Sequence, residues 1–123
     1  MTYYTICKEF EWLVDIGASK HMTPFISVLH KQTTLKSPIK ISLPDDSAKT
    51  ISIIGEVYLY GWITLKKVLF VPDFTHNMLY VSTLLDGINL IAQFVTHLFW
   101  FQDPITKEVV AQGKGHKGLY KLF

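Results

Sequence analysis

The sequence predicts an all-β domain, and three features of its pattern support this fold class. Its apolar runs are short, rich in β-branched and aromatic residues, and divided by Gly, Pro and Asp. Apolar and polar residues alternate strictly over residues 39–43 and over most of 50–54, as in half-buried strands. Helical periodicity is nearly absent. We therefore expect an all-β domain with one short helix and a C-terminal β-meander extension.

The first half of the chain supplies three expected strands. Residues 12–14 form a compact apolar run that ends at Asp15. The two alternating segments follow, and the residues between them, 43–49, include Pro, Asp and Ser. These residue types favour an exposed turn, so the two segments should form a hairpin.

The second half continues as shorter elements. Residues 56–62 and 63–71 are divided near Gly61 and should form another hairpin. Asn77 and Gly87 have the residue types that cap and end a short helix. Four short strands are then expected at residues 88–95, 97–102, 107–112 and 118–123.

Composition excludes several classes of protein. With 123 residues, 49% of them hydrophobic, the chain should form one packed domain rather than remain disordered. Cys7 is the single cysteine and the 5 histidines lack ligand spacing, so neither a disulfide framework, nor a metal site, nor another cofactor is expected. No segment reaches the roughly 20 apolar residues that cross a bilayer, and the amino terminus lacks the pattern of a signal peptide. We expect an intracellular, cytoplasmic protein without a membrane partner.

The charge pattern does not favour nucleic acid as a partner of this segment. All 12 basic residues are lysines, and Lys66-Lys67 is the one adjacent pair. Nucleic-acid faces usually concentrate their basic residues and use the bidentate fork of arginine. The aromatic residues 99–101 could stack on bases, but their alternation favours core packing for at least one ring.

Asp15 is the strongest candidate for chemistry. An apolar strand delivers its carboxylate to a turn that contains Gly17 and Ala18. Two carboxylates within hydrogen-bonding distance share one proton and activate a water against a peptide carbonyl, which is the chemistry of aspartic proteolysis. Taken alone, an Asp before a Gly turn is also an ordinary turn residue.

Several landmarks in the right order resemble the protease region of copia-type retrotransposon Pol polyproteins. The first has the pattern Asp-x-Gly-Ala-Ser-x-His-Met, the second resembles the flap turn, and the last resembles the segment that precedes the integrase. The landmarks lie at residues 12–24, 43–47, 68–73 with 77–84, and 118–122.

The resemblance implies a retroviral-type (retropepsin-like) β-barrel with a flap hairpin at residues 12–87. Residues 1–11 would then be an N-terminal extension. Residues 88–123 would be the start of the pre-integrase region, as a β-meander packed on the barrel or continuing it.

The resemblance also implies a site and an activity. Asp15 would be catalytic, with Ile16, Gly17 and Ala18 in the active-site loop and with Asp45, Asp46 and Ser47 in the flap. The implied ancestral function is aspartic endopeptidase cleavage of a polyprotein. Since the sequence has one Asp-x-Gly-Ala element, a site with two aspartates requires a homodimer, and its substrate would be a peptide or polyprotein.

Three positions depart from the family pattern. Ile16 stands where the family has Ser or Thr, whose hydroxyl group hydrogen-bonds across the dimer, so weak or absent activity is expected. Asp46 replaces the flap glycine, and Tyr80 replaces a small Ser. The alternative function is therefore a non-catalytic β-barrel, a structural or protein-interaction module derived from a transposon. His21 is expected to be a neutral structural residue rather than a general base.

Overall fold

The computed structural model describes residues 10–15, 20–42, 46–59, 63–86, 88–116 and 119–122. Over these residues the chain is an all-β, barrel-like domain with one short α-helix, as the sequence predicts. The strands are β1 (Trp12–Asp15), β2 (Met22–Thr23), β3 (His30–Ser42), β4 (Ala48–Tyr58), β5 (Thr64–Phe70), β6 (Asn77–Tyr80), β7 (Ile91–Phe94), β8 (Leu98–Gln102), β9 (Val109–His116) and β10 (Leu119–Leu122). A 3-10 turn covers Ile26–Val28, and α1 covers Val81–Asp86.

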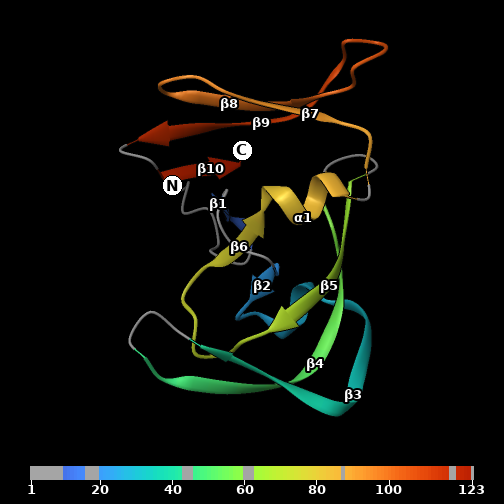
Figure 1. The fold of residues 1–123 in the computed structure, drawn as a ribbon, viewed down its shortest axis with the longest axis vertical. Helices are drawn as coiled ribbons and strands as arrows, with labels where there is room; N and C mark the ends of the chain where they lie inside the picture. Colours follow the sequence, from blue (N-terminus) through green and yellow to red (C-terminus); the bar gives the residue numbers. More distant parts are fainter. Residues whose placement is uncertain are drawn as a thin grey trace, which may run out of the picture.

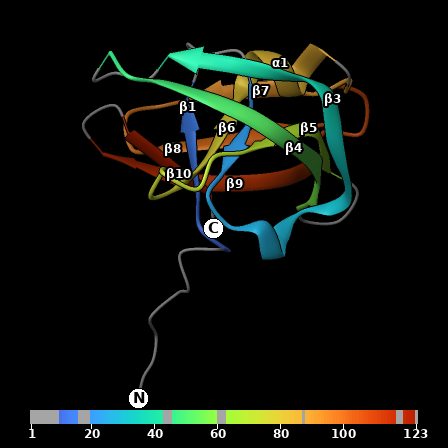
Figure 2. The ribbon, with the colours of Figure 1, turned by 90° about the horizontal axis from the view of Figure 1, so that it is seen from below.

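The described strands form one sheet of 10 strands in the order β3-β4-β5-β2-β6-β1-β10-β9-β8-β7. The sheet is strongly curved: the β3–β4 hairpin lies at the bottom of Figure 1, β7 to β10 lie at the top, and β6 and α1 lie between them. Figure 2 shows β3 and β4 side by side as a long, twisted hairpin. Because β1 is flanked by β6 and β10, its carboxyl end lies in the middle of the domain.

The first hairpin is longer than the sequence predicts. β3 begins at His30, whereas the alternation in the sequence starts only at residue 39. The sequence does not reveal residues 30–38 as part of the strand, because most of their side chains are exposed and give no period-two signal. The expected break between residues 54 and 56 is wrong, since β4 is one strand through Gly55. A Cβ atom at Gly55 would lie 2.8 Å from the carbonyl oxygen of His30, so only glycine permits this close approach of β3 and β4.

The second hairpin is confirmed, since β4 pairs with β5 in antiparallel fashion. The expected helix over residues 77–87 is only partly right. Asn77–Tyr80 forms β6, because these residues pair in parallel with β1, and the helix covers only Val81–Asp86. Asn77 is therefore not a helix cap. Tertiary pairing here prevails over the local helix signal.

The C-terminal strands continue the sheet through the pairing of β10 with β1. Phe99 and Phe101 are fully buried, as their alternation predicts, while Trp100 on the other face is partly exposed. The rings of Phe94, Phe99 and Tyr120 pack together with centroid distances of 5.1 to 5.6 Å. These residues join the same apolar core as Trp12 and Val14.

Candidate active site

Asp15 is the last residue of β1, and its side chain is exposed. The apolar run Trp12, Leu13 and Val14 is buried and holds β1 in the core. The Asp15 carboxylate therefore lies at the carboxyl end of the strand. In the parallel register, Asp15 lies opposite Tyr80 on β6. The loop residues Ile16, Gly17 and Ala18, which the sequence assigns to the same site, lie outside the described residues.

A groove of about 800 Å³ lies beside Asp15. One wall is the end of β3, from Ile39 to Ser42, which belongs to the long hairpin. The other walls are supplied by Lys20, by residues 73–76 and by Tyr80. The structure therefore brings the predicted catalytic carboxylate and the base of the predicted flap to the same groove.

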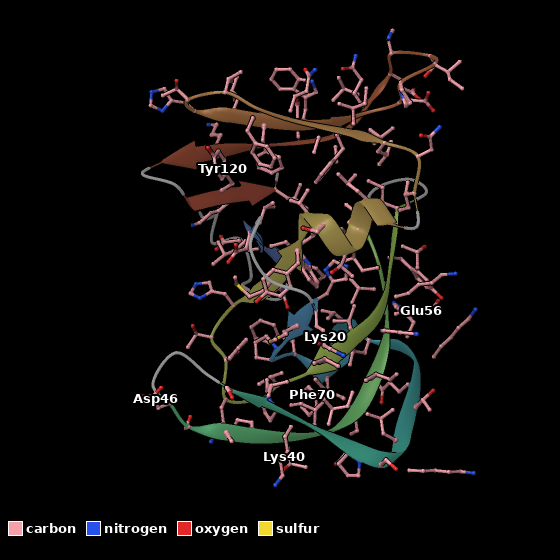
Figure 3. All side chains as sticks on the ribbon, in the orientation of Figure 1. Lys20, Lys40, Asp46, Glu56, Phe70 and Tyr120 are labelled. Atoms are coloured by element: carbon pink, nitrogen blue, oxygen red, sulfur yellow. The ribbon has the colours of Figure 1, made fainter. Side chains whose placement is uncertain are left out.

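The described part of the hairpin tip has a tight turn. Asp46 lies at this tip (Figure 3), and its φ of 67° is in the left-handed region that favours glycine. Aspartate tolerates this region better than most residues, so it can stand where the resemblance implies a flap glycine. Ser47 is half-buried and directly precedes β4, while Asp45 lies outside the described residues.

An ion pair links the hairpin to the groove wall. The Nζ atom of Lys49 on β4 lies 2.7 Å from a carboxylate oxygen of Asp73. Both side chains are substantially exposed, so the pair contributes at most about 1 kcal/mol. The ion pair holds the beginning of β4 close to the wall of the groove.

His21 supports the strand that faces Asp15. It is 2% exposed, and its Nδ1 atom accepts a hydrogen bond of 3.0 Å from the backbone N–H of Tyr80. Burial lowers the pKa of His21 from 6.5 to about 4. His21 is therefore a neutral structural side chain at neutral pH, as the sequence predicts, and not a general base.

Tyr80 is the large residue at the position where the resemblance implies a small Ser. It is buried, and its ring stacks on that of His21 with a centroid distance of 6.4 Å. Burial raises the pKa of the Tyr80 hydroxyl, and the negative charge of Asp15 raises it further. The hydroxyl group thus stays protonated beside the carboxylate.

A second set of buried polar groups lies below the site, and the sequence gives a signal for only one of its members. The Thr23 hydroxyl donates to Oδ1 of Asn77, and the Asn77 amide nitrogen donates to the carbonyl oxygen of Glu11 at 3.0 Å. Thr23 and Asn77 are both fully buried. These bonds tie β2, β6 and the residue before β1 together, so they fix the strand that carries Asp15. The polar Asn77 in an apolar segment was the available signal, which we interpreted as a helix cap.

Protonation of His21 should make stability depend on pH. The unfolded histidine takes up a proton near pH 6.5, but the folded one does so only near pH 4, so stability is complete above about pH 6.5 and falls as the pH decreases to about 4. The full loss corresponds to about 3 kcal/mol for this shift. Urea unfolding at a series of pH values measures the slope.

The control for this prediction is His21→Asn, because the Oδ1 atom of asparagine can replace Nδ1 as the acceptor for Tyr80 but does not titrate. This variant should lose most of the slope between pH 6.5 and 4. An unchanged slope in His21→Asn would show that another group causes the pH dependence.

Among the described residues, no group of three or more His, Cys, Asp or Glu side chains could hold a metal ion. The described part of the chain also includes no helix that is long and apolar enough to cross a membrane.

The fold is therefore that of a β-barrel-like domain. An aspartate ends one of its inner strands and lines a groove beside a long hairpin. Residues 12–87 match the family model described as the Pol polyprotein, beta-barrel domain. This match covers more than half of the chain, and the chain belongs to that family. No curated protein matches the chain, and no solved structure matches it.

Proposed function

We propose that this chain is a retropepsin-like aspartic endopeptidase subunit of a copia-type Pol polyprotein. The observation that carries the proposal is the position of Asp15, whose carboxylate lines the groove beside the β3–β4 hairpin. A peptide in this groove lies next to the carboxylate. The resemblance of residues 12–24 to the protease region of such polyproteins supports the same role.

Catalysis requires a second copy of the chain. Within the sequence, Asp15 is the one aspartate in an Asp-x-Gly-Ala element, so its carboxyl partner is Asp15 of another subunit. In the dimer the two carboxyl groups share one proton. The ionised group removes a proton from a water, and the protonated group donates a hydrogen bond to the peptide carbonyl.

The groove suits an extended peptide. β3 is at one end of the described sheet order, and its residues 39–42 form a wall of the groove. The backbone of an edge strand can pair with an added strand, which is a common way of binding peptides. The main chain of the substrate would therefore pair along β3 while its scissile bond reaches Asp15.

Ile16 limits the turnover of this site. Its side chain has no hydroxyl group to hydrogen-bond across a dimer, so the two aspartate loops are held less well than with Ser or Thr. The same residue favours the second candidate function, a β-barrel that binds peptides in the same groove without cleaving them. Weak cleavage and no cleavage are experimentally separable.

The Asp15→Asn variant tests the proposed mechanism. The natural chain at high concentration should slowly cleave peptides from a mixed library at mildly acidic pH, about pH 6, where His21 still stabilises the fold. Asp15→Asn should remove this cleavage, because it removes the ionisable pair. Fragments are quantified by mass spectrometry.

Two outcomes would contradict the proposal. Cleavage that persists in Asp15→Asn at the natural rate would exclude Asp15 as the catalytic group. A chain that stays monomeric in sedimentation at the highest soluble concentration, with the peptide present, could not assemble a site with two aspartates.

A further inference from the structure

A second cavity of about 530 Å³ lies beside the groove that contains Asp15. Lys20 and Ile39 line both hollows, so the two adjoin at these residues. Lys20 lies in the centre of the domain, near β5 (Figure 3). A side chain of a peptide in the groove can therefore enter this cavity between Lys20 and Ile39.

The mouth of the cavity is positively charged. Lys20, Lys66 and Lys67 line it, and no carboxylate is among the described residues that do so. None of the three lysines forms an ion pair within the described part of the chain. Their charges are thus available to a ligand.

A β-bulge directs Lys66 and Lys67 to the same cavity. In a regular strand, neighbouring side chains point to opposite faces. Here the β4–β5 register shifts, since Gly55 pairs with Val68 and Val57 pairs with Leu65, which leaves two lysines opposite the single residue Glu56. Lys67 has a φ of 55°, and both lysines line the cavity.

The cavity also contains a buried donor for which the described residues supply no acceptor. Nδ1 of the neutral His21 accepts the hydrogen bond from Tyr80, so its proton is on Nε2. No residue in the described ranges accepts a hydrogen bond from this N–H group, although His21 is 2% exposed and lines the cavity. A buried donor normally has a partner, so a ligand atom in the cavity is well placed to supply the acceptor.

The remaining walls are apolar. Leu65, Leu69 and Leu84 are buried and line the cavity. A matching ligand has a short hydrocarbon stem and an anionic end that accepts hydrogen bonds. Among peptide side chains, glutamate has both features.

We infer that this cavity is a specificity pocket for an acidic side chain, in particular glutamate, of a peptide bound in the groove. The carboxylate accepts a hydrogen bond from Nε2 of His21 and lies between the ammonium groups at the mouth, and its stem packs on the leucines. This inference rests on the proposed peptide-binding function of the groove.

Peptide binding to the Asp15→Asn chain tests the inference without cleavage. A fluorescent, mostly apolar peptide is varied by placing Glu or its neutral isostere Gln at each position in turn, and binding is measured by fluorescence polarisation. At one position Glu should bind about tenfold tighter than Gln, as expected for a charge-assisted hydrogen bond. At the other positions the two residues should bind about equally.

The double variant Lys66→Gln, Lys67→Asn should reduce this preference to about twofold or less, since asparagine tolerates a positive φ. The matched control is Lys36→Gln, Lys107→Asn, because Lys107 also has a positive φ, of 68°, and neither control lysine lines the cavity. The control variant should keep the full preference.

The possible outcomes distinguish a failure of the specificity pocket from a failure of peptide binding in the groove. Measurable binding with equal affinity for Glu and Gln at every position would overturn the specificity pocket and leave the peptide groove in place. A preference for Glu that the cavity variant retains would also overturn it. Absence of binding for every peptide would contradict the proposed function and the inference with it.

Discussion

Replacing Gly113 with alanine is expected to destabilise the domain by about 3 kcal/mol or more, because overpacking against a backbone atom cannot be relieved by a side-chain rotation. A Cβ atom at Gly113 on β9 would lie 1.9 Å from the carbonyl oxygen of Lys121 and 2.4 Å from the ring of Phe99. Phe99 is fully buried, so its ring has no space to move into. Urea unfolding monitored by tryptophan fluorescence measures the loss.

The matched control for this prediction is Gln112→Ala, the preceding position on the same strand, whose side chain is exposed. It should change the stability by less than about 0.5 kcal/mol. If Gly113→Ala unfolded at the same urea concentration as the natural chain, β9 and β10 would not approach as closely as described. The position of β10 beside β1, and hence the support of the Asp15 strand, would then be wrong.

Replacing Ile16 with threonine is expected to raise the rate of peptide cleavage about tenfold to a hundredfold. The gained hydroxyl can make the hydrogen bond across the proposed dimer that the resemblance to copia-type proteases implies, and about 1 to 3 kcal/mol of positioning energy converts to this factor. The measurement is the initial rate of cleavage at saturating peptide and equal dimer concentration.

Ile16→Val is the control, because valine has the shape of threonine but no hydroxyl group. It should cleave no faster than the natural chain. Equal gains in the two variants would show that the smaller volume, and not the hydrogen bond, limits catalysis. No gain in Ile16→Thr, with peptide binding intact, would favour the non-catalytic peptide-binding function.

The parts of the fold that the sequence predicts are those with a local signal. Residues 39–43 and 50–54 alternate in the sequence, and the structure places residues 39–42 in β3 and residues 50–54 in β4 of the long hairpin. Residues 30–38 extend β3 with mostly exposed side chains, so no period reveals them. Asn77–Tyr80 has a helical signal but pairs with β1, which lies more than 60 residues away in the sequence.

In the candidate site too, only the residues with a local signal in the sequence could be predicted. Asp15 could be identified because the apolar strand and the turn residues adjoin it in the sequence. The cavity beside it could not, since it depends on His21, on the bulge at Lys66 and Lys67, and on Leu84 of α1 meeting in space. The sequence gives no sign that the lysine pair shares a direction, because this direction results from the register shift.

A subunit-mixing measurement tests most directly whether the active site needs Asp15 from two copies of the chain. Ile16→Thr protein is mixed with the Ile16→Thr, Asp15→Asn double variant at constant total concentration, and cleavage is measured after the subunits exchange. With random pairing, an equal mixture should keep about one quarter of the activity of Ile16→Thr alone, because only dimers with both aspartates are active. An activity of about one half, in proportion to the intact chain, would show that each subunit acts alone and would contradict the account.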